Sequence, residues 1–238
     1  MIPRYPKVRR IPHPGGPRLE GKRYLGLEDL LALFNGIVYV EEKLDGSQFS
    51  LVVDEGRVLA YPRGRERIRS PEPPSYSGLL RWILENRDRL LRLGEGIALY
   101  GEWLRVRRVV PYDSLPDWAI FFDAYDLAEG RFLGYEEKVE LIEGLGLSAP
   151  PLLARLELEC RGKREVKVII ERLADIAEGR SAFSSTARSM EGIVVKNYER
   201  EMFAKLVNPW YEVELEEIIP SRGLEFNELG ATRQKSGM

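Results

Sequence analysis

The feature that most constrains the fold of this chain is a series of short apolar runs, several of which carry a charged residue at or near one end. The runs are rich in β-branched and aromatic residues, which is typical of β-strands. They lie at residues 37–42, 49–53, 57–61, 97–104, 118–125, 192–196 and 202–207. Segments with helical spacing of apolar residues lie at 27–34, 75–93, 135–145, 165–178 and 212–219. Strands and helices come in blocks rather than in strict alternation, which predicts an α+β fold with antiparallel sheets.

The charged residues on these runs are a second constraint. Buried strands seldom carry lysine or glutamate without a partner or a role. If the strands share a sheet, one groove receives Lys43, Asp45, Glu102, Asp126, Glu191, Lys196 and Lys205. Such a groove can bind a nucleoside triphosphate with Mg²⁺, because carboxylates hold the metal and cationic side chains hold phosphates. Ordinary cross-strand ion pairs are the alternative for any single residue.

Lys43 is the candidate nucleophile, since it stands between two strand-like runs and a neutral lysine amine can attack phosphoryl centres. An ordinary lysine, with a pKa of about 10.4, is protonated at neutral pH and cannot attack. We expect Lys196, Lys205, Arg63 and a divalent metal to lower the pKa of Lys43. Asp45 acts in the opposite direction, so we expect it to orient the site or the substrate.

Composition excludes several classes of chemistry. The chain holds one histidine and one cysteine, which excludes zinc sites and Ser–His or Cys–His catalysis of the usual kind. Cys160 alone cannot form an internal disulfide, so a reducing cytoplasm is expected. No apolar run approaches membrane-spanning length, and the N-terminus is too polar and proline-rich for a signal peptide. The net charge of −2 means that nucleic-acid binding needs a local basic patch.

The chain divides into three parts by composition. Residues 1–20 carry five prolines and are expected to form an extended arm. Residues 21–220 are assigned to the catalytic domain, and residues 221–238 form a tail whose low apolar content is compatible with disorder. About thirty residues follow Lys205, whereas an OB-type domain needs on the order of a hundred, so none is expected here.

Arginine occupies every second position from residue 63 to residue 69, so in an extended chain these side chains share one face. Two interpretations are open. The segment is either a solvated edge strand protected by its charge or a strip that binds phosphates. The residues predicted to contact nucleic acid are Arg63, Arg65, Arg67, Arg105 and Arg107.

Six segments, in order, resemble the motifs of the covalent nucleotidyltransferase superfamily, which contains ATP-dependent DNA ligases, RNA ligases and mRNA capping enzymes. They are Lys43-Leu44-Asp45-Gly46, Pro62-Arg63-Gly64, Tyr100-Gly101-Glu102-Trp103, Phe121–Asp126, Glu191–Lys196 and Phe203-Ala204-Lys205. Within the superfamily, the Gly-Glu-Trp and Glu-Gly-x-Val-x-Lys segments look most like the RNA ligase branch. The resemblance implies an adenylation domain of two mainly antiparallel sheets with flanking helices, similar to ATP-grasp folds.

The resemblance also implies a reaction. Lys43 would attack the α-phosphate of ATP, with Mg²⁺ or Mn²⁺ placed by Glu191, to form lysyl-AMP and release pyrophosphate. AMP would pass to the 5′-phosphate of an RNA, and a 3′-OH would then seal the ends, as in RNA repair. The residues implied to contact the nucleotide are Glu42, Asp45, Gly46, Arg63, Glu102, Phe122 or Tyr125, Val194, Lys196 and Lys205.

Among these residues, Glu102 would bind the ribose, and an aromatic side chain (Phe122 or Tyr125) with Val194 would hold the adenine. Arg63 would bind the ribose or the 5′-phosphate of the acceptor. The remaining lysines of the fourth and fifth motifs, Lys196 and Lys205, would contact the α-phosphate.

One position departs from the family pattern. Phe203 stands where the fifth motif usually has the first of two lysines, so one phosphate contact is missing or is supplied by another basic residue.

Two other functions are alternatives to an RNA ligase: a capping-type guanylyltransferase and a non-catalytic RNA-binding relic. The missing OB-type domain counts against capping, and the retained Lys43, Glu102 and Glu191 count against a relic. The natural RNA substrate and the oligomeric state stay open.

Overall fold

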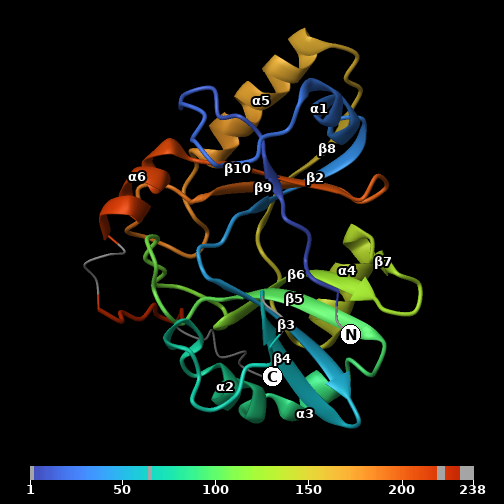
Figure 1. The fold of residues 1–238 in the computed structure, drawn as a ribbon, viewed down its shortest axis with the longest axis vertical. Coiled ribbons are helices and arrows are strands. Elements are labelled where there is room, and N and C mark those ends of the chain that lie inside the picture. The colour runs from blue at the N-terminus through green and yellow to red at the C-terminus, as the bar shows by residue number, and fades with distance from the viewer. Residues whose placement is uncertain (1–2, 64–65, 219–222, 231–238) are drawn as a thin grey trace, which may run out of the picture.

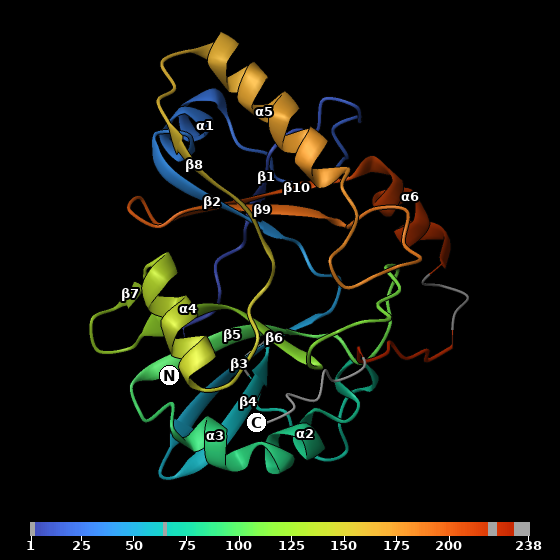
Figure 2. The ribbon, with the colours of Figure 1, turned by 180° about the vertical axis from the view of Figure 1, so that it is seen from behind.

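The computed structural model describes residues 3–63, 66–218 and 223–230. Within these residues two five-stranded sheets face each other, with helices on their outer sides (Figures 1 and 2). Both sheets are mainly antiparallel and neither closes into a barrel, which confirms the predicted fold class. None of the described helices combines the length and the apolarity that a membrane span requires.

The first sheet contains the beginning and the end of the motif series. Its strands, in spatial order, are β1 (Arg9–Arg10), β10 (Met202–Val207), β9 (Gly192–Asn197), β2 (Gly36–Glu42) and β8 (Leu152–Leu158). β1 runs parallel to β10, and the other neighbours are antiparallel. The helices α1 (Leu27–Leu33) and α5 (Lys163–Ala177) cover its outer face, where Leu33, Val38 and Leu173 belong to one buried core (Figure 1).

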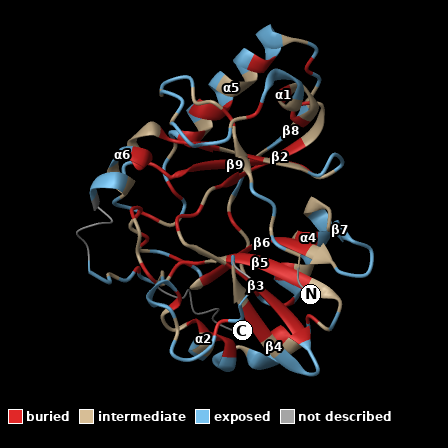
Figure 3. Cartoon of the chain, in the orientation of Figure 1, coloured by how far each residue is buried: buried red, intermediate tan, exposed pale blue. Residues whose placement is uncertain are grey.

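The second sheet contains the middle motifs. Its strands, in spatial order, are β4 (Arg57–Pro62), β3 (Ser47–Asp54), β5 (Ile97–Trp103), β6 (Ala119–Asp126) and β7 (Arg131–Phe132). Its outer face is covered by η1 (Pro74–Tyr76), α2 (Leu79–Glu85), α3 (Arg87–Leu91) and α4 (Tyr135–Gly144). A last helix, α6 (Pro209–Ile218), follows β10. Figure 3 shows that both sheets are largely buried, whereas α2 and α5 expose one side to solvent.

The elements predicted from periodicity are present, but three strands were not predicted. β8 pairs with β2 at the edge of the first sheet, and β1 and β7 have two residues each. The segment 75–93 forms η1 and two short helices that meet at Asn86. Residues 66–70 form no strand, so the arginine segment is not an edge strand in its described part.

Two segments near the ends of the described residues, 3–8 and 223–230, pack against the body of the molecule. Residues 3–8 run from β1 toward the second sheet (Figure 1). Residues 223–230 lie along the loop after β5, with Phe226 bridging to Val106 and Leu229 to Leu115. The rest of the predicted tail, residues 221–222 and 231–238, lies outside the described residues.

Candidate active site

Lys43 lies where the chain passes from one sheet to the other. β2, in the first sheet, ends at Glu42, and β3, in the second sheet, begins at Ser47. The backbone N–H of Lys43 donates to the carbonyl of Gly192 at 2.9 Å, which ties this segment to β9. The tertiary fold therefore places Lys43 at the junction of the two sheets.

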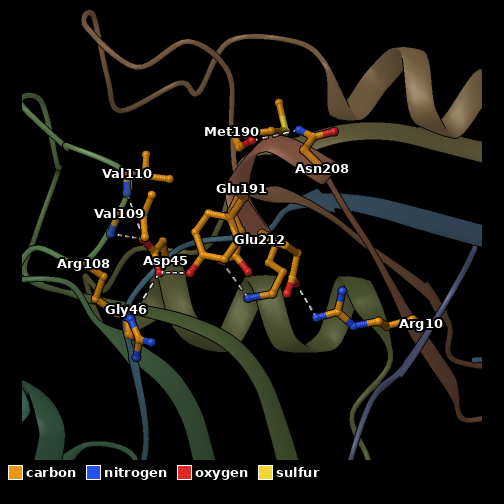
Figure 4. A network of polar contacts seen from close by, with 12 residues as sticks. Arg10, Asp45, Gly46, Arg108, Val109, Val110, Met190, Glu191, Asn208 and Glu212 are labelled. Atoms are coloured by element: carbon orange, nitrogen blue, oxygen red, sulfur yellow. Dashed lines mark hydrogen bonds and ion pairs between the residues drawn. The ribbon is translucent and has the colours of Figure 1, made fainter. Parts of the chain in front are cut away.

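Asp45 holds the segment after Lys43 in place (Figure 4). Its carboxylate accepts the backbone N–H groups of Val109 at 2.7 Å and Val110 at 2.9 Å. It also accepts the hydroxyl of Tyr211 at 2.6 Å and lies 3.4 Å from Nε of Arg108. Buried carboxylates with this many donors are strongly fixed, so Asp45 orients the loop. A contact between Asp45 and the nucleotide stays a prediction.

Two motif glycines are required by close backbone approach. A Cβ atom at Gly46 would lie 2.7 Å from the carbonyl oxygen of Trp103, and one at Gly192 would lie 2.1 Å from that of Leu206. Real Cβ contacts are not this short, so any other residue would push the strands apart. These glycines allow β3 to meet β5, and β9 to meet β10, beside Lys43.

Two cavities meet at Lys43. The inner cavity, about 120 Å³, lies between the sheets, and the outer cavity, about 460 Å³, opens toward α6. Both are lined by Lys43, Gln48, Arg63, Glu102 and Lys205. Phe122 on β6 and Val194 on β9 also line the inner cavity, from opposite sheets. Asp45, Gly46 and Glu191 line the outer cavity.

Tyr125 lies apart from these cavities. It packs edge-on against Phe132, with the ring centroids 5.0 Å apart, and belongs to an aromatic cluster near the far end of the second sheet. Of the two aromatic candidates for holding the base, Phe122 is therefore the one placed at the cavity.

The carboxylates around Lys43 determine its charge. Its Nζ donates to Oε2 of Glu191 at 3.0 Å. Burial favours the neutral amine, but Glu191, Glu102 and Asp45 together outweigh burial and raise the pKa of Lys43 above its ordinary value. Among the described side chains the carboxylates therefore have a larger effect on this pKa than the neighbouring cations. A lower pKa in the presence of the divalent metal stays a prediction.

The same surroundings change the pKa values of Glu102 and Glu191. Burial raises the pKa of each to about 7, and the Lys43 ammonium offsets part of that effect. Oε2 of Glu102 is buried and has no hydrogen-bond partner among the described residues. A buried carboxylate oxygen without a donor is costly, so this atom is available to a ligand in the cavity.

Glu42 and Lys205 complete the surroundings of Lys43. Glu42 accepts the backbone N–H of Ala182 at 3.0 Å, and burial raises its pKa. Burial lowers the pKa of Lys205 to about 8, with Lys43 and Arg10 adding to the effect. Arg10 was not predicted, because nothing in the sequence near it indicates that the arm returns to the site.

Lys196 occupies a different environment from the one expected. Its ammonium pairs with Oε2 of Glu41 at 2.7 Å and Oδ2 of Asp123 at 2.9 Å. Lys138, which is fully buried on α4, also pairs with Glu41, and burial lowers its pKa to about 8. These four residues, the buried charge cluster, link the two sheets behind the inner cavity. Lys196 reaches that cavity with an ammonium already bound to two acids.

The arginines predicted to contact nucleic acid are dispersed. Arg63 lines both cavities, whereas Arg67 is exposed and lines neither, and Arg65 lies outside the described residues. Arg105 donates to the carbonyl of Ser77 at 3.0 Å and stacks over Phe226 at 4.6 Å.

Arg107 pairs with Glu225 at 3.2 Å. Both Arg105 and Arg107 hold residues 223–230 against the body of the protein, so a role in nucleic-acid binding stays a prediction.

The sequence and the fold agree on one family. A family model described as RNA ligase matches residues 36–209. No curated protein matches the sequence. Among solved structures, a variant of Naegleria gruberi RNA ligase with ATP and Mn aligns with a TM-score of 0.56 at 19% identity, covering 80% of this chain and 54% of that chain.

The same Naegleria gruberi enzyme with PPi aligns with a TM-score of 0.58 at 19% identity, covering 80% of this chain and 55% of that one. A variant in the apo form gives a TM-score of 0.58 at 19% identity, covering 82% and 55%. At this identity the likeness shows a shared fold, and the present chain spans about 55% of the solved chains. The match over residues 36–209 contains every motif from Lys43 to Lys205, and the chain belongs to the RNA ligase family.

Proposed function

We propose that this protein is an ATP-dependent RNA ligase that acts through a lysyl-AMP intermediate on Lys43. The observation that carries the proposal is the position of the Lys43 amine. It lies at the junction of a narrow cavity with apolar walls and a wider cationic one, 3.0 Å from Glu191. A nucleoside triphosphate needs this combination, with an apolar slot for its base and cations for its phosphates.

The lining of the cavities supports one order for the parts of ATP. The adenine fits between Phe122 and Val194, which approach from opposite sheets. The unpaired oxygen of Glu102 is available to a ribose hydroxyl. The α-phosphate then lies near Lys43, where Lys205 and Arg63 line both cavities.

The chemical step follows from the same geometry. The neutral Lys43 amine attacks the α-phosphorus, the N–P bond forms, and the bond to the bridging oxygen breaks. Pyrophosphate leaves with the bonding electron pair. Oε2 of Glu191, 3.0 Å from Nζ, is positioned to take the proton that the nitrogen loses.

A divalent cation fits this donor set in the manner typical of Mg²⁺. No group of three or more His, Cys, Asp or Glu side chains among the described residues is arranged as a protein metal site. Mg²⁺ is commonly held by one or two carboxylates together with substrate phosphates, and Glu191 provides such a carboxylate. When bound, the cation supplies positive charge that favours the neutral form of Lys43. The Naegleria gruberi structures with ATP and Mn support this assignment.

The first test is covalent labelling. The purified protein is incubated with Mg²⁺ or Mn²⁺ and α-labelled ATP or GTP, then denatured. We expect label from ATP, and its loss in Lys43→Ala because the attacking amine is gone. Gel electrophoresis measures the label, and Lys167→Ala, which changes an exposed lysine on α5, is the matched control.

Label from GTP alone would instead identify a capping-type guanylyltransferase. If neither nucleotide labels the chain, or if the label survives Lys43→Ala, the proposed chemistry is wrong.

The second test concerns the acceptor. We propose RNA with a 5′-phosphate and a 3′-OH, bound at the outer cavity. Arg63→Ala should slow the joining of a nicked duplex or single-stranded RNA by about tenfold, because Arg63 lines both cavities and contributes a charged contact worth about 1.5–3 kcal/mol. Denaturing electrophoresis of labelled strands measures joining. Sealing of all-DNA nicks only would contradict the assignment to RNA.

A further inference from the structure

We propose that the N-terminal arm is part of the nucleotide site, and that Tyr5 is a binding residue that closes the base end of the inner cavity. The inference rests on the proposed function, and no family motif contains Tyr5. It is carried by the way in which residues 3–11 cross both sheets and by the ring contacts of Tyr5.

The arm is fixed at both ends. At one end β1 runs parallel to β10, with Arg10 opposite Lys205, and the N–H of Ile11 donates to the Lys205 carbonyl at 2.8 Å. At the other end the hydroxyl of Tyr100 on β5 donates to the carbonyl of Pro3 at 2.7 Å. The arm therefore runs from one sheet to the other, as the dark-blue segment in Figure 1 shows. Tyr5, Pro6 and Val8 of the arm line the inner cavity.

Tyr5 is held rigidly where the arm passes the cavity. Its ring meets Phe122 edge-on, with the centroids 5.0 Å apart, and lies 5.2 Å from the ring of Tyr100. Its hydroxyl donates to Asp123 of the buried charge cluster. Because that donor is already bound, Tyr5 offers the cavity its ring rather than its hydroxyl. The ring supports Phe122, on which the adenine is proposed to lie, and itself lines the same cavity.

The departure at Phe203 belongs to the same arrangement. Its ring stacks parallel to that of Tyr5, with an interplanar angle of 8° and the ring centroids 6.2 Å apart. It also meets the Phe132 ring edge-on, with the centroids 5.1 Å apart. A lysine at this position would lose both ring contacts and would bring another ammonium toward Lys196, whose own ammonium lies 5.9 Å from the Phe203 ring. Phe203 thus provides the surface on which the arm docks, in place of a phosphate contact.

The experiment compares a ligand that has a base with one that lacks it. Calorimetry measures the binding of ATP and of inorganic tripolyphosphate, each with Mg²⁺, to Lys43→Ala protein, which cannot form the covalent adduct. Adding Tyr5→Ala should weaken ATP binding about tenfold and leave tripolyphosphate binding within about twofold, because Tyr5 touches only the base end. Tyr5→Phe should restore ATP binding to within about twofold of the parent, since the ring is retained.

Tyr61→Ala is the matched control, because Tyr61 belongs to the same aromatic cluster and lines neither cavity. It should leave the affinity for ATP unchanged. Thermal unfolding measures whether each variant is folded. If Tyr5→Ala does not fold, Tyr5→Leu replaces it, and we expect this variant to bind ATP about threefold more weakly than the parent.

Equal weakening of ATP and tripolyphosphate binding would show a general structural role and overturn the inference. Tighter ATP binding by Tyr5→Ala would overturn it as well, since the arm would then obstruct the cavity. If wild-type protein takes label from ATP while Tyr5→Ala binds ATP normally, the inference alone fails. If the Lys43→Ala protein binds no ATP and the wild-type protein takes no label, both the inference and the proposed function fail.

Discussion

At the scale of single residues, the site is governed by competition between burial and charge. Lys43, Glu102 and Glu191 are crowded into a space where both carboxylates titrate near pH 7 and the lysine is held as an ammonium. The negative charge of bound phosphates alone would stabilise the Lys43 ammonium further. The positive charge that favours the neutral amine is therefore expected to come from a divalent cation that binds together with the nucleotide.

The raised pKa of Glu102 predicts how stability changes with pH. Its contribution to the free energy of unfolding is fully present below the ordinary pKa of 4.5 and is lost as the pH rises through about 7, because the folded state resists ionisation. Glu102→Gln removes this dependence. Urea unfolding should therefore show the Gln variant gaining stability relative to wild type between pH 5 and pH 8. Parallel pH profiles for the two proteins would contradict the prediction.

At the scale of elements, the segment from Lys43 to Gly46 is fixed by three neighbours. Gly192 on β9 accepts from Lys43, the loop at Val109 binds Asp45, and the end of β5 presses against Gly46. The Lys-x-Asp-Gly motif thus combines the proposed nucleophile, a carboxylate that fixes the loop and a glycine at a close backbone approach. Each of these roles depends on a different strand or loop.

Gly46→Ala is predicted to displace the nucleophile. The added Cβ would lie 2.7 Å from the Trp103 carbonyl oxygen and from a methyl of Leu104. The carbonyl oxygen is a backbone atom and cannot yield unless the end of β5 moves. We expect covalent labelling to fall by about tenfold or more and stability to fall by about 1–3 kcal/mol.

Gly144→Ala is the matched control, because a Cβ at Gly144 meets nothing within 4 Å in α4. It should label normally and gain up to about 1 kcal/mol in urea unfolding, since alanine favours the helix. Equal activity of the two variants would show that the close approach at Gly46 is unimportant.

At the scale of the whole molecule, the buried charge cluster holds the two halves together. Glu41 and Lys196 come from the first sheet, Asp123 from the second, and Lys138 from α4. Two acids and two bases make the cluster formally neutral, and the hydroxyl of Tyr198 donates to Asp123 at 2.7 Å. Such a cluster need not add net stability, but it specifies one packing of the sheets, because removing any member leaves the buried charges unbalanced.

Lys138→Met is therefore predicted to cost about 3–5 kcal/mol in urea unfolding, since it leaves Glu41 with one cation. Arg81→Met breaks an exposed ion pair with Glu85 and should cost less than about 1 kcal/mol. Similar losses in the two variants would show that the cluster has no special role in joining the sheets.

The sequence alone indicated the fold class and several of the residues that line the cavities around Lys43. Strand-like runs and helical spacing depend on local patterns of apolar residues, which the chain displays directly. β8 was missed although Ala154, Leu156 and Leu158 alternate with charged residues, because the segment contains none of the β-branched or aromatic residues that are typical of strands. Lys138 carried a signal as well, since it shares one helix face with Ile142 and Leu145.

Only the tertiary structure decided which charges pair and where the arm lies. Lys196 and Lys205 stand on strands of the same hairpin and both line the inner cavity, yet the Lys196 ammonium is bound to Glu41 and Asp123 whereas Lys205 forms no such pair among the described residues. Tyr5 reaches Asp123 across 118 positions of sequence. Such contacts depend on the packing of two sheets against each other, and no local pattern encodes a distance between residues so far apart in the chain.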